Sequence, residues 1–394
     1  MRKILFLGGS HGDITLIREA SKNGLQVITT GNAPSDLGHE FADDYVPGDF
    51  SDRVEMAALA RKLGCTYVCS STNDFSEISA SYIAEQMHFS GYDSLKTAES
   101  LHQKDSFRKI CSEIGVSAPK SISVSLYGPR SSIDSDFSGL IFPVLIKPVD
   151  LSGGKGIRFC RSILELETAL DDCFDSRSKQ NRVVVEEFIE GSNHGATFIV
   201  AKGAILFEFF DSEHYGVNKF LVAGTSTYQS LNEDIKESVR INLWRLVSAL
   251  DLKDGLVHIQ YILSKNRVFF IEVTRRTPGD MYTRFVELAT GYNYSGAILA
   301  SKTGHTIEKH NSAKPHRHIS RLSFHPPKNG EVHGYSLSEG AQNSLIEYFD
   351  LKKNSIQDFR QEKIGIGFFE FESEFQQREF VENFNELVTY KFID

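Results

Sequence analysis

The chain has 394 residues, of which 40% are hydrophobic and 24% charged, as in ordinary globular proteins. This length predicts two or three folded units. The net charge of −9 argues against a nucleic-acid or anionic-membrane partner. No apolar run approaches the roughly 18 to 20 residues of a membrane span, and the five scattered cysteines suit a reducing compartment. We therefore expect a cytoplasmic protein.

The first part of the chain alternates between strand and helix patterns. Strands are predicted at residues 3–7, 26–30, 45–47 and 66–70, and helices at 14–23 and 52–63. This order favours a doubly wound parallel sheet. The glycines at 8, 9 and 12 depart from the G-x-G-x-x-G spacing of a dinucleotide site, so a tight turn is favoured over nicotinamide binding.

The middle of the chain begins with a helix at residues 100–114 that contains Lys104. A strand at 140–147, a glycine-rich loop at 152–157, a helix at 163–174 and a strand at 183–189 follow. The next part is predicted to be antiparallel, with strands at 197–200, 204–210, 258–263 and 267–273 and helices at 233–250 and 285–300, the second interrupted by Gly291. The end of the chain reads as a smaller α+β unit whose final strand is 365–371 and final helix 374–386.

A first motif joins Lys147, at the end of its strand, to a loop of small residues. Such a loop lets amide N–H groups close on phosphate oxygens, and the lysine adds positive charge. The spacing is not that of a P-loop. We interpret the motif as a polyphosphate site made by Lys147 with Ser152, Gly153, Gly154 and Gly156.

A second motif follows a run of three valines. Residues Glu186, Glu187, Phe188 and Ile189 come where a buried strand would emerge at the edge of a cleft. Backbone groups there could meet the edge of an adenine. An ordinary strand that ends in a turn is the alternative.

A third motif lies at the end of a later apolar strand. Glu272, Thr274 and Arg276 alternate and so share one face, while Gln260 lies on the preceding strand. A carboxylate, weaker oxygens and a guanidinium together suit Mg²⁺ and phosphate. A structural salt bridge between Glu272 and an arginine is the alternative.

The three motifs, in this order, resemble the ATP-grasp superfamily, in particular its carboxylate–amine ligase and carboxylase-like branch. The resemblance extends from Met1 to about residue 300. It implies a preATP-grasp doubly wound domain at residues 1–98 and an ATP-grasp module at 99–310, with two α+β subdomains gripping ATP. A lid-like subdomain is expected at about 117–190, and a small C-terminal α+β unit at 311–394.

The resemblance also implies a role for individual residues. Lys104, Lys147 and the glycine loop would hold the phosphates of ATP, backbone groups of Glu187 and Ile189 the adenine, and residues near Asn193 the ribose. Glu272 would be the main Mg²⁺ ligand, with Gln260 and Thr274 where the family has an acid and an asparagine. Arg276 would steady the transferred phosphoryl group, making Arg276 and Lys147 the catalytic pair.

The implied function is an ATP-dependent ligase that activates a carboxylate as an acyl-phosphate and transfers it to an amine. One alternative is a purine-pathway-like or carbamoyl-phosphate-like activity on formate, bicarbonate or a nucleotide amine. Another is a nucleotide-binding regulator with reduced catalysis, which Gln260 and Thr274 favour. A homodimer is possible. The candidate substrate-binding residues are His11, Asn73, Asp74, Arg276, Asp280 and Arg284.

Overall fold

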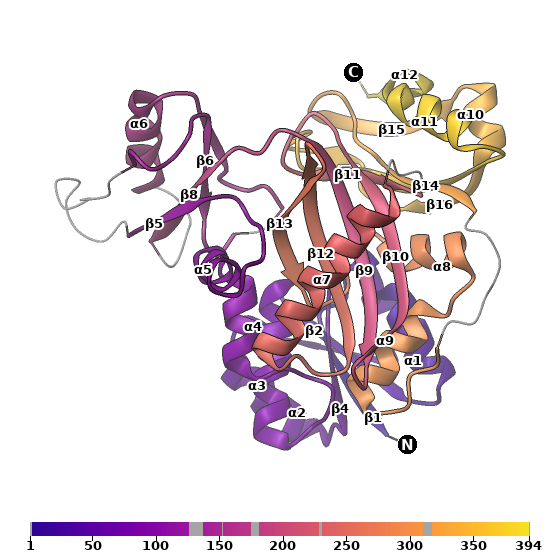
Figure 1. The fold of residues 1–394 in the computed structure, drawn as a ribbon. Helices are drawn as coiled ribbons and strands as arrows, with labels where there is room; N and C mark the ends of the chain where they lie inside the picture. Colours follow the sequence, from indigo (N-terminus) through magenta and orange to yellow (C-terminus); the bar gives the residue numbers. More distant parts are fainter. Residues whose placement is uncertain are drawn as a thin grey trace.

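The computed structural model describes residues 2–125, 137–151, 153–174, 181–227, 231–309 and 317–393. The predicted loop residue Ser152 lies outside these ranges. The fold is mixed α/β, as predicted, and has a parallel sheet at the N-terminal end and antiparallel sheets after it. Figure 1 shows the N-terminal unit, the lid with β6 and β8, the central sheet and the C-terminal unit around that sheet.

The N-terminal unit is a parallel four-stranded sheet in the order β3-β2-β1-β4. Leu5 and Leu7 pack against α2 and α3, whereas Ile4 and Phe6 pack toward α1. Both faces are therefore covered, which confirms the doubly wound prediction. The elements are β1 (Lys3–Leu7), η1 (His11–Asp13), α1 (Ile14–Lys22), β2 (Gln26–Gly31), η2 (Leu37–Phe41), β3 (Asp44–Pro47), α2 (Arg53–Leu63), β4 (Tyr67–Ser70) and α3 (Asp74–Met87).

The side chain of His39, from the same unit, packs against the glycine turn after β1. A Cβ atom placed on Gly9 would lie 2.2 Å from Nδ1 of His39. The turn therefore needs glycine to let His39 approach the backbone. This agrees with the tight-turn interpretation.

The lid is an antiparallel sheet in the order β5-β8-β6-β7, with α6 packed on one face. The predicted helix at 100–114 was wrong as a single helix, because the chain is extended at Gln103 (φ −74°, ψ 114°). Lys104 consequently begins a new helix. The elements are α4 (Leu95–His102), α5 (Lys104–Ile114), β5 (Ser121–Ser125), β6 (Val144–Pro148), β7 (Arg158–Cys160), α6 (Ile163–Phe174) and β8 (Arg182–Glu187).

The central sheet has eight strands in the order β13-β12-β9-β10-β11-β14-β18-β16. One face packs against α5 and α7, and the other against α8, α9 and the N-terminal α1. The predicted strand at 204–210 is longer than expected, and the helix predicted at 285–300 is interrupted at Gly291, as expected, to give two helices. The elements are β9 (Ser192–Ala201), β10 (Ala204–Tyr215), β11 (Val222–Ser226), α7 (Glu233–Leu250), β12 (Gly255–Ser264), β13 (Arg267–Thr274), α8 (Tyr282–Thr290) and α9 (Tyr294–Thr303).

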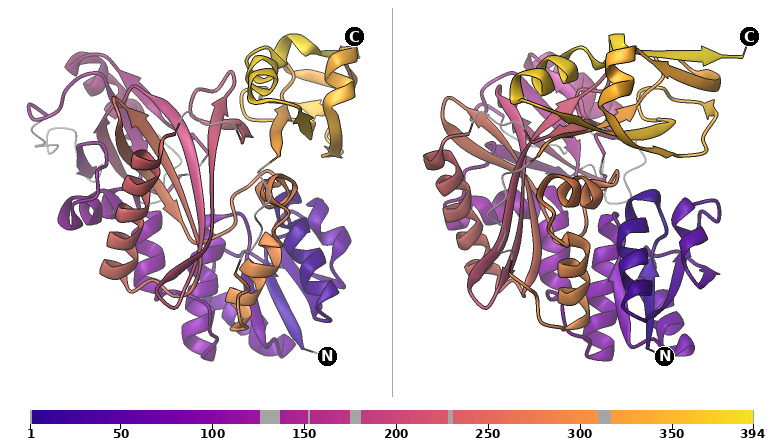
Figure 2. Two further views of the ribbon diagram at one scale, coloured as in Figure 1. Left: turned by 45° about the vertical axis from the view of Figure 1, so that its right-hand side comes forward. Right: turned by 90° about the vertical axis from the view of Figure 1, so that its right-hand side faces the viewer.

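The C-terminal region contributes three strands to the central sheet and forms a second sheet, β17-β15-β19. In the right-hand view of Figure 2, this region lies above the N-terminal unit. The predicted final strand at 365–371 is followed by another, and the predicted helix at 374–386 breaks at Asn383. The elements are β14 (His318–Phe324), β15 (Gly330–Leu337), α10 (Glu339–Ser344), β16 (Leu345–Asp350), β17 (Ser355–Ile356), β18 (Gly365–Phe371), α11 (Glu374–Glu382), α12 (Phe384–Leu387) and β19 (Val388–Phe392). Within the described ranges, no helix has both the length and the apolar character needed to cross a membrane.

Candidate active site

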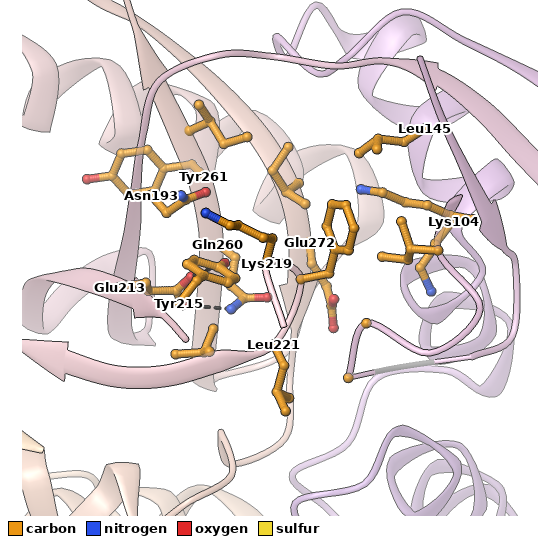
Figure 3. Close-up of a pocket in the computed structure, with 18 of the residues that line it drawn as sticks. Lys104, Leu145, Asn193, Glu213, Tyr215, Lys219, Leu221, Gln260, Tyr261 and Glu272 are labelled. Atoms are coloured by element: carbon orange, nitrogen blue, oxygen red, sulfur yellow. Dashed lines mark hydrogen bonds between the residues drawn. The ribbon is translucent and has the colours of Figure 1, made fainter. Parts of the chain in front are cut away.

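A cavity of about 870 Å³ lies between the lid and the central sheet, and Figure 3 shows part of its lining. Residues from all three predicted motifs meet there, although they are far apart in the sequence. The predicted residues that line it are Lys104, Lys147, Gly153, Gly154, Glu186, Glu187, Phe188, Ile189, Asn193, Gln260, Glu272, Thr274 and Arg276.

The glycine loop has a backbone that favours glycine. Gly153, Gly154 and Gly156 have φ values of 66°, 71° and 72°, in the left-handed region that other residues rarely adopt. A Cβ atom on Gly154 would also lie 2.6 Å from the carbonyl oxygen of Phe220. The loop thus packs closely against the connection between β10 and β11. Gly156 does not line the cavity, and its neighbour is Pro148.

Lys147 is held by a buried carboxylate in the lid. Its Nζ atom lies 2.5 Å from Oε1 of Glu186, and Nε of Arg108 donates to Oε2 of the same carboxylate at 3.0 Å. Burial opposes ionisation of Glu186, but the positive charges of Arg108 and Lys147 lower its pKa. Arg108 also donates to the carbonyl of Ile271 at 2.8 Å, so one network links the lid to β13.

Lys104 begins α5 at the edge of the cavity, and its Nζ atom donates to the carbonyl of Leu151. Burial lowers the pKa of this lysine, and the nearby charge of Lys147 acts in the same direction, whereas Glu272 raises it. Two lysines so close together favour an anion between them and the glycine loop. This is the chemistry that a polyphosphate requires.

The segment after β8 offers few free N–H groups. The N–H of Glu187 donates to Lys120 at 3.0 Å, and that of Phe188 donates to Pro143 at 2.9 Å. Among the described residues, the N–H of Ile189 has no such partner. An N–H contact from this segment to a base edge would therefore come from Ile189.

The opposite wall carries Glu272 on β13, directly paired in register with Gln260 on β12. The side chain of Glu272 is 34% exposed, and its Oε1 lies 3.9 Å from Nη2 of Arg276. Oγ1 of Thr274 donates to the carbonyl of Arg276 at 3.4 Å. Gln260 donates through Nε2 to Oε1 of Glu213 at 2.6 Å.

These oxygen donors fit a Mg²⁺ ion that shares its coordination with phosphate. Glu272 presents a carboxylate and Gln260 an amide oxygen to the cavity that contains Lys104 and Lys147. Within the described ranges, no group of three His, Cys, Asp or Glu side chains is arranged to hold a metal. Mg²⁺ commonly uses one or two protein oxygens together with substrate phosphates and waters, and Glu272 and Gln260 could supply the protein oxygens of such a set.

Arg276 is positioned by the N-terminal unit. Its Nε atom donates to Oδ1 of Asp74 at 2.6 Å, and His102 lies 3.6 Å from the other oxygen of that carboxylate. Burial opposes ionisation of Asp74, yet Arg276 and His102 hold its pKa well below the usual range. The guanidinium is therefore fixed at the boundary between the two units.

A second group of charges surrounds Asp280. Nε2 of His11 lies 3.2 Å from Oδ1 of Asp280, Nη1 of Arg321 donates to its carbonyl at 2.7 Å, and Lys363 forms an ion pair with its carboxylate. Four candidate substrate residues, His11, Asp74, Arg276 and Asp280, thus lie in this region. The side chain of Asn73, which precedes Asp74, caps α3, and Arg284 pairs with Glu347 in a different groove.

A buried acid lies beneath the cavity, on β10. Asp211 is fully buried and accepts a hydrogen bond of 2.5 Å from the hydroxyl of Tyr282. Burial, and then the negative charge of Glu213, raise the pKa of Asp211 to about 7. The sheet therefore holds a carboxyl group close to half-protonated at neutral pH.

Several residues of the site were not found from the sequence. They are Arg108, Glu213, Tyr215, Lys219, Arg321 and Lys363. Asp211, Glu213 and Tyr215 continue the alternation of Phe207 and Phe209 along β10, and this period of two was the available signal. Arg321 and Lys363 reach the site through long-range strand pairing, for which the local sequence carries no signal.

Comparison with known proteins finds one matching domain and several relatives of low sequence identity. A sequence profile described as an ATP-grasp domain matches residues 140–284. The chain is 25% identical over 302 residues to formate-dependent phosphoribosylglycinamide formyltransferase of Wolinella succinogenes, covering 75% of this chain and 74% of that protein. It is 26% identical over 200 residues to the C-terminal section of the carbamoyl phosphate synthase large chain of Aquifex aeolicus, covering 50% of this chain and only 36% of that protein.

Among solved structures, the L-amino acid ligase from Bacillus licheniformis superposes with a TM-score of 0.83 at 17% identity, over 100% of this chain and 99% of the other. This likeness concerns the fold. Residues 140–284 thus match an ATP-grasp domain, and the fold of the whole chain is similar to that of the ligase.

Proposed function

We propose that the chain is an ATP-dependent ligase that joins a carboxylate to an amine through an acyl-phosphate and releases ADP and phosphate. One observation carries the proposal. The cavity that gathers the lysines, the glycine loop, Glu272 and Arg276 also reaches Asp280 and Arg321. There is thus room for a nucleotide and for a second molecule beside its phosphates.

In this proposal, ATP lies with its adenine at residues 186–189, its ribose near Asn193, and its phosphates among Lys104, Lys147 and residues 152–156. Glu272, Gln260 and Thr274 would hold Mg²⁺. When bound, that ion neutralises part of the charge of the β- and γ-phosphates. Lys104 and Lys147 supply fixed positive charge on the other side, at no reorganisation cost during the reaction.

The reaction then has two steps. A carboxylate oxygen of the substrate attacks the γ-phosphorus, and the bond from that phosphorus to the bridging oxygen breaks as the electron pair leaves with ADP. The amine nitrogen next attacks the acyl carbon, and phosphate leaves with the electron pair of the broken C–O bond while the amine loses a proton. Arg276, fixed by Asp74, stabilises charge on the transferred group. Positioning and charge account for this chemistry.

The charges around Asp280 support a carboxylate as the substrate. Arg321 and Lys363 both lie against Asp280, so two cations face one anion. A substrate carboxylate would find donors there without displacing Asp74 from Arg276. The amine substrate is then expected on the open side of the cavity.

The experiment is ADP release by the purified chain with ATP and Mg²⁺, against panels of amino acids, small carboxylates and amines. At least one carboxylate–amine pair should stimulate release and yield a new amide. With that pair, Lys147→Ala and Glu272→Ala should each reduce kcat by about 10² to 10³, as when one charged donor is removed from a transition state. Lys109→Ala, an exposed lysine of α5, is the matched control. Near-normal turnover by Glu272→Ala would contradict the proposal.

A second candidate is a purine-pathway-like or carbamoyl-phosphate-like ligation of formate, bicarbonate or a nucleotide amine. It is favoured by the similarity to the Wolinella succinogenes formyltransferase, which extends over 75% of this chain. Formate, bicarbonate and a phosphorylated ribosylamine therefore belong in the panel. ADP release with these molecules, and none with amino acids, would favour this candidate.

Tight ATP binding without turnover in any panel would instead favour the nucleotide-binding regulator. A homodimer stays a prediction, and the mass of the purified protein measured by light scattering tests it.

A further inference from the structure

Gln260 replaces an acid that the family resemblance leads one to expect, and its surroundings are unusual. The amide does not stand alone, because its Nε2 atom donates to Oε1 of Glu213 at 2.6 Å. The two side chains come from β12 and β10, which are separated by β9. Gln260 pairs in register with Gly195 of β9, and the carboxylate of Asp211 packs over that glycine, where a Cβ atom would lie 2.7 Å from Oδ2 of Asp211.

The hydrogen bond fixes the orientation of the amide. With Nε2 directed at Glu213, the amide oxygen of Gln260 lies on the side of Glu272, as Figure 3 shows. Among the described residues, nothing donates to that oxygen. Glu272 and Gln260 both line the cavity, so a carboxylate and a directed amide oxygen face the same space.

Glu213 is a buried carboxyl group. Its second oxygen accepts a hydrogen bond of 3.0 Å from the hydroxyl of Tyr215. Burial raises the pKa of Glu213, whereas the charge of Arg321 lowers it. The described residues form no ion pair with Glu213, and Arg321 is bound to Thr225 and Asp280. A carboxylate at this buried position is costly unless a cation or metal compensates for it.

We propose that Glu213 and Gln260 work as one unit, in which Glu213 positions Gln260 so that its amide oxygen joins Glu272 in holding the divalent cation of the nucleotide. The inference rests on the proposed function, because it presumes a metal–nucleotide complex. The second carboxyl group of the site is then Glu213, which contacts the amide nitrogen of Gln260 rather than the cation. An anion that accepts from the amide N–H makes the amide oxygen a stronger donor, as outer-sphere partners do for other metal ligands.

The pair can be tested by exchanging its two groups. Mn²⁺ serves as the probe, with a non-hydrolysable ATP analogue, and electron paramagnetic resonance measures the free ion. E213Q should weaken Mn²⁺ binding by about 10- to 100-fold, the usual loss when an outer-sphere partner is removed. The double variant E213Q/Q260E keeps one carboxylate, one amide and a hydrogen bond between them, and should bind Mn²⁺ within a few-fold of the parent chain.

Two further variants make the result decisive. E208Q changes a glutamate on the same strand that pairs with Arg240, and it should leave Mn²⁺ binding unchanged. Q260M removes the amide oxygen, together with the hydrogen bond to Glu213, and keeps the carboxyl group of Glu213, so it tests the ligand even if E213Q does not fold.

Unchanged Mn²⁺ binding by folded E213Q or by Q260M would overturn the inference, and so would a double variant as weak as E213Q. If the parent chain binds the nucleotide analogue and Mn²⁺ but shows one of these results, only this inference fails. If the parent chain binds neither, the proposed function fails with it.

Discussion

The lid wall and the sheet wall of the cavity hold their charged side chains in different ways. On the lid side, Lys147 of β6 and Arg108 of α5 are tied to the buried carboxylate of Glu186 at 2.5 and 3.0 Å. On the sheet, Glu272 is one-third exposed, and its contact to Arg276 is 3.9 Å. The cations are thus fixed before any ligand arrives, whereas the carboxylate is left free. This is the division expected if phosphate meets a rigid surface and the metal arrives with the nucleotide.

The contrast between the two walls depends on Glu186, which we expect to fix the cations of the lid wall. Glu186→Gln leaves two buried cations, Lys147 and Arg108, without their counter-charge. Breaking a buried ion pair from one side typically costs about 3 to 5 kcal/mol. We expect the urea midpoint of lid unfolding to fall, together with faster hydrogen exchange in β6 and β8. Because the pKa of Glu186 is lowered in the fold, the parent chain should lose this contribution as the pH falls through that pKa.

The matched control is Glu190→Gln, the same change at an exposed position four residues later. It should leave both the midpoint and the exchange rates close to those of the parent chain. An equal shift in the two variants would mean that Glu186 has no special role in fixing the lysine.

The same contrast explains what could be read from the sequence. Lys147, the glycine loop and Glu272 were predicted because each is part of a local pattern, namely the end of an apolar strand or a run of small residues. Glu186 was placed in the segment whose backbone would meet the adenine, which stays a prediction, and its side chain binds Lys147 and Arg108. That contact joins residues 39 positions apart on paired strands, and the local sequence does not record it.

The fold was predictable to a similar extent. The alternation of strands and helices gave the doubly wound unit, and α7 (Glu233–Leu250) has the predicted bounds. The end of β10 was missed because Asp211 and Glu213 are charged residues, which are rarely buried in a strand. Their burial follows from the neighbouring strands and from Tyr282, and these neighbours are set by tertiary structure.

A smaller effect, on the sheet side, concerns Asp211. Its pKa rises from 3.8 to about 7 because it is buried and lies near Glu213. The folded chain therefore binds a proton that the unfolded chain has lost, and the free energy of unfolding should fall as the pH rises from about 4 to 7, by on the order of 3 kcal/mol. Asp211→Asn removes this dependence. The variant should exceed the parent chain in stability at pH 8, and the difference should vanish near pH 4.

Urea unfolding at several pH values measures this difference. Asp254→Asn, at an exposed position, reports the effect of a surface change of the same type. If the free energies of unfolding of Asp211→Asn and the parent chain differed by the same amount at all pH values, the prediction would be contradicted. The ionisation of Asp211 would then not contribute to the pH dependence of stability.

The smallest expected effect is that of replacing Arg284, which lies outside the cavity. The sequence offered Arg284 as a substrate residue, but its guanidinium pairs with Glu347 at 2.8 Å, in a groove beside α1 that is separate from the cavity. Both side chains are about one-third exposed, and such surface pairs contribute about 0 to 1 kcal/mol. Arg284→Ala should therefore change the unfolding free energy by no more than this and leave the KM of both substrates unaltered. The comparison is Arg321→Ala, which removes a cation that lines the cavity and should raise the KM of the carboxylate. If Arg284→Ala raised that KM as much as Arg321→Ala does, the substrate region would have to extend past Asp280 into the groove beside α1.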